Sequence, residues 1–382
     1  MKSICLITSH APSLVNFRAT AISSLTELGY KVWALAPNFD DEIRAKVIQL
    51  GATPLDCPIE RAGMNPLMDM LNTWRLFLLL RKLKPDVVLG YFIKPVVFGS
   101  LAAFLARVPR RIAMVEGLGF VFTECDEPLS RKRRLLKSLV LLLYKAGMAC
   151  AHRVVFLNPD DRDELIAAGV VPVDKTYLLG GIGVDLQQWP PLAYPIGPIT
   201  FLLVARLLRE KGIKQYVDAA RLVKVKHPQA RFILLGGLDD NPGALTENQV
   251  LAWAQEGVVE WHGHTAVQPW MAHASVYVLP SWREGVPVST QEAMASSRAV
   301  ITTNVPGCRE TVIDGVNGFL VPPRDPQALA EAMCRFIQWP DLVKTMGEAS
   351  LALARERYNE HEVNARLMSV LLGEVVTNEK AV

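Results

Sequence analysis

The sequence lacks the patterns that mark a secreted, zinc-stabilised or membrane-spanning protein. Its six cysteines are scattered without a Cys-x-x-Cys pair, which predicts a reducing compartment, no disulfide framework and no zinc site. No run of 18 uncharged apolar residues occurs, so no transmembrane helix is expected. The first ten residues, with one lysine and a short apolar run, predict a strand and not a signal peptide.

A strong excess of charge is also missing, because the net charge is only +3 over 382 residues. The sequence has no basic stripe interleaved with aromatic residues, so nucleic-acid binding is not expected. The charge is unevenly spread: residues 1–190 hold 23 Lys and Arg against 18 Asp and Glu, whereas the rest hold 18 against 20. The basic N-terminal half therefore suggests an acidic partner surface.

The chain is half hydrophobic and long enough for two domains. Apolar runs that predict buried strands alternate with helical patterns in both halves. The expected strands are residues 4–8, 32–36, 87–89, 111–115, 154–157, 199–204, 231–235, 258–261, 276–279 and 299–302. The expected helices are residues 17–28, 41–50, 66–83, 95–106, 212–226, 246–255 and 287–295. This alternation predicts an α/β fold with two Rossmann-like, doubly wound parallel sheets, whose ligands bind beyond the carboxyl ends of the strands.

Four prolines within residues 189–198 predict a stiff connector between the two domains. We expect an N-terminal domain at 1–190, a linker at 191–198 and a C-terminal domain at 199–358. The remaining segment, 359–382, is expected to form a helix that packs back on the first domain. Two such domains would face each other across a cleft, with one ligand bridging them.

The stretch of residues 280–295, PSWREGVPVSTQEAMA, has the local chemistry of a sugar-nucleotide site. It follows an apolar strand, turns at Glu284-Gly285 and enters a helix near Pro287. The free N–H groups and the positive dipole end of a helix N-terminus bind phosphate. Glu284 and Glu292 bracket this end, and carboxylates accept hydrogen bonds from sugar hydroxyls. We therefore interpret the stretch as a phosphate site between two hydroxyl-binding sites.

Several motifs keep a shared order and spacing along most of the chain. They are Val204-Ala205-Arg206-Leu207 with Lys211-Gly212, Glu284-x7-Glu292, Pro306-Gly307-Cys308-Arg309-Glu310, Asp314-Gly315-x-Asn317-Gly318-Phe319-Leu320-Val321-Pro322 and, more faintly, Asn158-Pro159-Asp160-Asp161 and Gly183-Val184-Asp185. Together they resemble glycosyltransferase family 4, the large retaining group with the GT-B fold. The variant Glu284-Gly285-Val286-Pro287 is most similar to members that extend lipid-linked sugars in bacterial surface polysaccharides.

The resemblance implies a nucleotide-sugar donor site in the second domain and an acceptor site in the first. Arg206 and Lys211 would bind the donor diphosphate and stabilise its developing negative charge, as fixed cations can. Glu284 would hold hydroxyls of the transferred sugar, and Glu292 those of the ribose. The donor-binding candidates are Arg206, Lys211, His262, Gly263, Glu284, Gly285, Val286, Pro287, Val288, Ser289 and Glu292.

These roles have plain structural alternatives. Arg206 and Lys211 can be read as a solvated charged turn, and Glu292 as an exposed helix residue. Ser289 could contact phosphate or only cap the helix. His262 and Gly263 would form the base-binding turn, although His262 could be only a turn residue.

In the first domain the sequence departs from the family pattern. Many relatives place a histidine after the fifth strand, near the reacting sugar, but here that position holds Glu116. Glu116 could orient the donor sugar or the acceptor hydroxyl, or act as its base; alternatively, it is a structural carboxylate bonding the backbone of residues 117–119. His10, after the first strand, could assist the acceptor hydroxyl or be a loop residue without that role. The catalytic candidates are therefore His10, Glu116, Arg206, Lys211 and Glu284.

Two weaker patterns point to other ligands. Asp161-Arg162-Asp163 spells the Asp-x-Asp metal signature of a different glycosyltransferase fold, but residues 160–164 also read as the acidic first turn of a helix. The glycines at 117–119 and 180–183 do not follow the first strand, where a dinucleotide fingerprint would lie. We therefore expect no metal and no cofactor, with the nucleotide sugar as a co-substrate.

A basic segment opens a predicted helix in the first domain. Arg131, Lys132, Arg133 and Arg134 precede an apolar run that contains Lys137. Such a helix can contact an anionic membrane surface, or it can be a core helix with a solvated basic first turn. The first interpretation suggests a cytoplasmic protein, peripheral on the cytoplasmic face of the inner membrane.

The expected function is retaining, metal-independent glycosyl transfer. A hexose or N-acetylhexosamine would move from a nucleotide sugar, with UDP as the expected nucleotide, to a lipid-linked or growing saccharide of a cell-surface polysaccharide. The alternatives are a GT-B nucleotide-sugar epimerase, a sugar phosphorylase, or a non-catalytic sugar-nucleotide-binding partner of a membrane assembly.

Overall fold

The computed structural model describes residues 2–59, 65–123, 131–239, 241 and 243–373. They divide into two compact units, one of Met1–Ile182 with His361–Val382 and one of Gly183–Glu360. The chain therefore passes between units at 182/183 and at 360/361. The proline-rich residues 189–198 lie inside the second unit, where Arg298 Nη2 donates a hydrogen bond to the carbonyl of Ala193 (2.9 Å).

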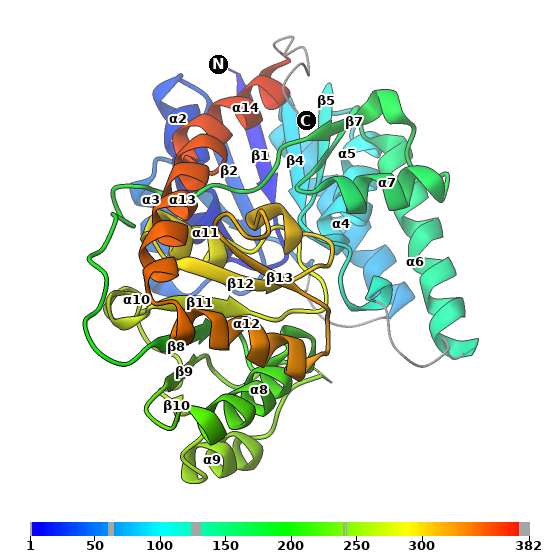
Figure 1. Cartoon of the computed structure of the whole chain (residues 1–382). Helices are drawn as coiled ribbons and strands as arrows, with labels where there is room; N and C mark the ends of the chain where they lie inside the picture. The colour runs from blue at the N-terminus through cyan, green and yellow to red at the C-terminus, as the bar shows by residue number, and fades with distance from the viewer. Residues whose placement is uncertain (1, 60–64, 124–130, 240, 242, 374–382) are drawn as a thin grey trace. The chain divides into compact units, whose positions relative to one another are not determined.

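The first unit is built on a seven-stranded parallel sheet of order β3-β2-β1-β4-β5-β6-β7 (Figure 1). Its strands are β1 (Ser3–Ile7), β2 (Lys31–Ala36), β3 (Thr53–Asp56), β4 (Val87–Tyr91), β5 (Arg110–Val115), β6 (Arg153–Phe156) and β7 (Thr176–Leu178). Its helices are α1 (Pro12–Phe17), α2 (Ala19–Glu27), α3 (Asp41–Gln49), α4 (Pro66–Leu83), η1 (Pro95–Gly99), α5 (Ser100–Leu105), η2 (Phe120–Phe122), α6 (Arg131–Cys150), α7 (Pro159–Ala167), η3 (Val173–Lys175) and most of α14 (Glu360–Leu372). The apolar strands are buried by helices on both faces, as the continuous hydrophobic runs predict.

The order of the strands reverses between β1 and β4, which makes the carboxyl ends of these two strands the switch point of the sheet. Loops leaving β1, β4 and β5 therefore open at one edge. Helix α14 packs in this unit: Asn364 Nδ2 donates to Ser24 Oγ (3.0 Å), and Arg110 Nη2 donates to the carbonyl of Val370 (2.6 Å).

The second unit has a six-stranded sheet of order β10-β9-β8-β11-β12-β13, also parallel throughout. Its strands are β8 (Thr200–Val204), β9 (Arg231–Leu235), β10 (Glu260–Trp261), β11 (Val276–Leu279), β12 (Ala299–Thr303) and β13 (Gly318–Val321). Its helices are η4 (Arg209–Lys211), α8 (Ile213–Lys226), α9 (Glu247–Gln255), α10 (Gln268–His273), α11 (Val288–Ala295), η5 (Arg309–Thr311), α12 (Pro326–Gln338) and α13 (Asp341–Arg357). The switch point lies between β8 and β11, so both predicted Rossmann-like sheets are confirmed.

The structure corrects several element boundaries. The single helix expected at 17–28 is two helices, α1 and α2, because Arg18 leaves the helical conformation (φ −133°). The helix expected at 95–106 opens with the π-helical turn η1 before α5. Strand β3 carries Pro54, which an edge strand tolerates, and the sequence pattern therefore did not reveal it.

Within the described part of the chain, no helix is both long and apolar enough to cross a bilayer.

Candidate functional site

In the second unit, the loops after β8 and β11 bring Lys211 and Glu284 together. Lys211 Nζ lies 2.5 Å from Glu284 Oε1, and both side chains are largely buried. Gly212 makes this approach possible, since it has φ +71° and a Cβ there would lie 1.9 Å from the carbonyl oxygen of Pro280. The sequence placed these two residues in separate motifs, and the fold joins them at the switch point.

The loop that carries Glu284 is held by the ends of neighbouring strands. Thr302 Oγ1 donates to the carbonyl of Leu279 (2.7 Å), and the Glu284 N–H donates to the carbonyl of Pro306 (3.1 Å). A Cβ on Gly307 would lie 2.2 Å from the Glu284 carbonyl oxygen, so the Pro306-Gly307 motif allows the two loops to pack. Glu284 is therefore fixed through its backbone as well as through its ion pair.

Helix α11 begins directly after this loop with an uncapped N-terminus. Its N-cap is Pro287, which makes no side-chain capping bond, and the helix has no acidic residue in its first turn. Ser289 is the second residue of the helix and not its N-cap, and its Oγ accepts a hydrogen bond from the Tyr277 hydroxyl (2.7 Å). The first turn consequently presents its positive dipole end without a carboxylate of its own, which suits an anion.

Glu292, on the same helix, is a partly buried carboxyl group without a counter-ion. Within the described residues, no cation or hydrogen-bond donor contacts its side chain, and burial raises its pKa to about 8. Its raised pKa and inward setting differ from the exposed, ion-paired helix residue of the alternative interpretation. Ligand hydroxyls that donate to it would favour the ionised form.

Arg206 follows β8 but pairs away from Lys211. Its Nη1 lies 2.8 Å from Asp239 Oδ2, and 46% of the Arg206 side chain remains exposed. Burial opposes ionisation of Asp239, but hydrogen bonds from the Asn241 backbone and from Arg206 lower its pKa overall. In this state Arg206 is a tethered cation at the carboxyl edge of β8.

His262 and Gly263 follow β10 at the same edge of the sheet. The imidazole of His262 stacks on the indole of Trp270, with ring centroids 3.9 Å apart. Gly263 has φ +66° and its carbonyl accepts a hydrogen bond from the Gly236 N–H (2.8 Å). This turn thus pairs an aromatic platform with a glycine that has open space where a Cβ would lie.

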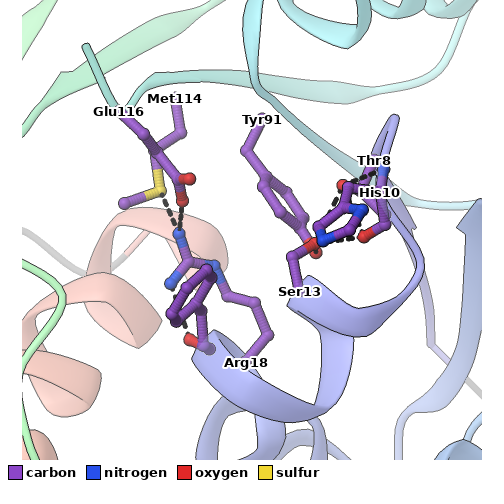
Figure 2. Close-up of polar contacts among 8 residues, drawn as sticks. Thr8, His10, Ser13, Arg18, Tyr91, Met114 and Glu116 are labelled. Carbon is purple, nitrogen blue, oxygen red and sulfur yellow. Dashed lines mark hydrogen bonds and ion pairs between the residues drawn. The ribbon is translucent and has the colours of Figure 1, made fainter. Parts of the chain in front are cut away.

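In the first unit, Glu116 sits directly after β5 and is paired with Arg18 (Figure 2). The exposed fraction of the side chain is 7% for Glu116 and 2% for Arg18. The alternative in which Glu116 bonds the backbone of residues 117–119 is not observed, since its partner is Arg18 Nη2. Burial raises the pKa of Glu116, and the charge and hydrogen bond of Arg18 oppose that rise.

A chain of hydroxyl groups lies beside this pair (Figure 2). Tyr91 at the end of β4 is 3.0 Å from Ser13 Oγ, which lies 3.0 Å from Thr8 Oγ1. Ser13 also donates to the carbonyl of His10 (2.6 Å). His10 is thereby fixed through its backbone in the loop after β1, near the same edge as Glu116.

Sequence reasoning missed three residues of these two clusters: Arg18, Asp239 and Tyr277. Arg18 was hidden inside an apparently continuous helix, and Tyr277 read as an ordinary strand residue. An arginine on the buried side of a predicted helix was the one usable signal, because an unpaired buried charge is costly.

The Asp-x-Asp pattern falls on helix α7. Asp161 is buried and its N–H bonds the side chain of Asn158 (2.8 Å), whereas Asp163 is exposed and pairs with Arg162. Across the described residues, no three His, Cys, Asp or Glu side chains gather closely enough to hold a metal ion. The acidic first turn of a helix is therefore the observed arrangement.

Comparison with known proteins connects both units to glycosyl transfer. Residues 19–179 match the family described as "Glycosyl transferase 4-like domain", and residues 198–338 match "Glycosyl transferases group 1". The fold agrees: sucrose-phosphate synthase from Thermosynechococcus elongatus superposes with a TM-score of 0.80 at 19% identity, covering 98% of this chain and 99% of that one. Anabaena Alr3699/HepE, solved with UDP and glucose, gives 0.75 at 18% identity, covering 98% and 100%. The chain belongs to the glycosyltransferases with the GT-B fold and family 4-like domains.

Two curated relatives span most of this chain. The N,N'-diacetylbacillosaminyl-diphospho-undecaprenol alpha-1,3-N-acetylgalactosaminyltransferase of Campylobacter jejuni is 28% identical over 346 residues, covering 86% of this chain and 88% of that protein. The UDP-Gal:alpha-D-GlcNAc-diphosphoundecaprenol alpha-1,3-galactosyltransferase of Escherichia coli is 24% identical, covering 79% and 80%. Both names describe transfer to a sugar carried on a diphospho-undecaprenol lipid.

Proposed function

We propose that this protein transfers a hexose or N-acetylhexosamine, with retention, from a nucleotide sugar to a lipid-linked saccharide during synthesis of a cell-surface polysaccharide. The observation that carries the proposal is the Lys211–Glu284 pair beside the uncapped N-terminus of α11. It brings a cation, a helix dipole and a hydroxyl-binding carboxylate together where the loops after β8 and β11 meet. Those are the groups that a diphosphate and its attached sugar need.

The donor occupies the switch point of the second unit in this proposal. Lys211 and Arg206 bind the diphosphate and stabilise the charge that builds up as the sugar–phosphate bond breaks. Glu284 accepts hydrogen bonds from the sugar, and Glu292 accepts them from the ribose. The acceptor hydroxyl attacks from the same face as the leaving group, and the leaving phosphate takes its proton.

The acceptor is a saccharide on a diphosphate lipid, as in the names of the two relatives above. The nucleotide is UDP, since the name of the Escherichia coli relative begins with a UDP sugar and Anabaena Alr3699/HepE was solved with UDP and glucose. The transfer needs no metal, because fixed cations supply the charge. Retained activity in the presence of a chelator is the corresponding expectation.

Contact with the membrane surface is assigned to α6. Of the five basic residues expected there, Lys137 pairs with Glu164 (2.8 Å) and Arg133 donates to the carbonyl of Thr123. Arg131, Lys132 and Arg134 are exposed, as is a row of apolar residues one helical turn apart, Leu135, Leu139 and Leu142. Basic residues next to an exposed apolar row suit an anionic membrane surface on the cytoplasmic side, at about 1 kcal/mol per basic residue.

The proposal is tested by a thermal-shift screen of nucleotide sugars, followed by product analysis with the best donor and diphosphate-lipid-linked sugars. Nucleotide release that depends on the acceptor is expected for a transferase. Release that depends on free phosphate would instead indicate a phosphorylase, and isomerised donor without release would indicate an epimerase.

Variants of the donor site complete this test. Arg206→Ala and Glu284→Ala are expected to lower transfer strongly, whereas Lys214→Ala, which removes an exposed pair with Asp218 on α8, should not. Wild-type transfer rates in both donor-site variants would overturn the proposal. Binding of a donor without turnover of any acceptor would favour a non-catalytic partner.

A further inference from the structure

Among the described residues of the first unit, the most deeply buried ion pair joins Arg18 and Glu116 and lies outside the proposed donor site. Glu116 follows β5, and Arg18 separates α1 from α2, so the two residues come from segments 98 positions apart. Both side chains are almost completely buried. A pair of this kind is weak evidence for stability, because a well-packed apolar pair often does as well. The pair lies at the carboxyl edge of β1, β4 and β5, and this position suggests a chemical role.

Three contacts hold Arg18 in addition to its ion pair with Glu116 (Figure 2). Its Nη1 donates to the carbonyl of Phe17 (2.7 Å), and its Nη2 lies 3.2 Å from the sulfur of Met114. The guanidinium carbon also lies 4.9 Å from the centre of the Tyr91 ring. The break between α1 and α2 at Arg18 is what turns this side chain inward. The cation is therefore fixed by the fold, and it fixes one oxygen of Glu116 in turn.

Only one oxygen of the carboxylate is used in this way. Arg18 bonds Oε1 of Glu116, and no described residue bonds Oε2. In addition, Nε of Arg18 is buried and has no partner within the described part of the chain. The pair thus keeps one acceptor and one donor uncommitted at the edge of the sheet where ligands bind.

The charge of Arg18 affects whether the carboxyl group of Glu116 is ionised. Burial raises the pKa of the Glu116 carboxyl, and a protonated carboxyl would donate a hydrogen bond instead of only accepting. Arg18 opposes that protonation. The other titratable groups at this edge are Tyr91, whose pKa burial raises to about 12, and His10 in the loop after β1.

We propose that Arg18 is a positioning residue, which holds Glu116 as an ionised carboxylate with one oxygen directed to accept a hydrogen bond from a hydroxyl of the saccharide substrate. This inference rests on the glycosyl transfer proposed above. It assigns to the first unit a carboxylate–arginine pair at the position where relatives of the family carry a histidine. Arg18 itself acts through Glu116.

The test is the pH profile of kcat/KM from pH 5.5 to 9 for the wild type, Arg18→Gln, Arg18→Lys and Glu116→Gln. Loss of the cation should raise the pKa of Glu116 further, so the acidic limb of Arg18→Gln moves upward by at least about one pH unit. Its activity should fall about 10- to 100-fold at pH 7 and recover in part at pH 9. Arg18→Lys should lie between the two, and Glu116→Gln should be weak at every pH without this limb.

A double variant separates positioning from folding. If Arg18 acts only through Glu116, adding Arg18→Gln to Glu116→Gln should change kcat/KM by less than about twofold. Arg298→Gln removes a buried arginine in the second unit and should not move the acidic limb as Arg18→Gln does. Circular dichroism and Tm identify a variant that does not fold. If Arg18→Gln does not fold, the pH profile of Arg18→Lys is compared with that of the wild type instead.

Two results would overturn the inference. One is an Arg18→Gln profile that is lower by the same factor at every pH, since that is the signature of a purely structural role. The other is full additivity of the two substitutions. An inactive wild type with every acceptor would instead count against the proposed function, so the two failures are distinguishable.

Discussion

Glu116 in the first unit and Glu292 in the second are carboxyl groups whose pKa is raised by burial, yet their surroundings differ. Glu116 directly follows β5, one strand away from the switch point between β1 and β4, whereas Glu292 lies on α11, the helix after β11. Glu116 has an arginine in direct contact, whereas Glu292 has no cationic partner within the described residues. Burial raises the pKa of both groups, and only for Glu116 does a neighbouring charge oppose the rise.

This difference separates two ways of preparing a carboxylate for sugar hydroxyls. With Arg18 in place, Glu116 is charged and oriented before any ligand arrives. Glu292, with a pKa of about 8, becomes an efficient acceptor when ligand hydroxyls replace the water it has lost. The first arrangement favours fixed geometry, and the second couples binding to proton release.

The largest effect is expected from Lys211, the cation at the proposed donor site of the second unit. Lys211→Met removes the charge that faces Glu284 and, in the proposed reaction, the leaving diphosphate. Because one preorganised charge contact in a dry site is worth about 10²–10³ in rate, kcat should fall by that factor. Steady-state kinetics with the identified donor measure it. Lys214→Met is the matched control on the exposed pair with Asp218, and equal losses in both variants would contradict the role of Lys211.

A second effect concerns the pH dependence of donor affinity. If ribose hydroxyls donate to Glu292, binding favours its ionised form and lowers its pKa. Below the free pKa of about 8, affinity should therefore rise with pH, by up to about tenfold per unit, and level off above it. Isothermal titration of the nucleotide sugar between pH 6.5 and 9 measures this slope. In Glu292→Gln the slope should vanish and binding should be weak throughout; an unchanged slope would assign it to another group.

The same carboxyl group predicts a smaller effect on stability with an unusual sign. Its folded-state pKa lies above the value of an unfolded glutamate, so folding takes up a proton and stability falls as pH rises from about 4.5 toward 8. Glutamine does not titrate. Glu292→Gln should therefore raise Tm by a few degrees at pH 8.5 and by less at pH 5.5. A variant that melts earlier than wild type at pH 8.5 would show that Glu292 is structurally paired.

Most of the fold could be predicted from the sequence, because buried parallel strands have continuous apolar sequences that alternate with helical patterns. Sequence patterns also placed Glu284 and Glu292 in one motif and Arg206 and Lys211 in another, since each motif is local in the sequence. They did not reveal the pairings, because Lys211 meets Glu284 across 73 positions and Arg18 meets Glu116 across 98. Those contacts depend on the order of strands and on a helix break at Arg18, and no local propensity encodes either one.

The smallest effect is expected from the exposed pair of Arg206 with Asp239. Arg206 is nearly half exposed, and such pairs contribute about 0–1 kcal/mol, unlike the buried pair of Arg18. Asp239→Asn should leave stability nearly unchanged and release Arg206 toward the diphosphate, so the donor KM should fall by less than about fivefold at constant kcat. Arg206→Ala in the same assay should raise KM or lower kcat. If Asp239→Asn matched that loss, Asp239 would be positioning Arg206, and the contrast between a preorganised buried pair and a loosely tethered exposed one would no longer hold.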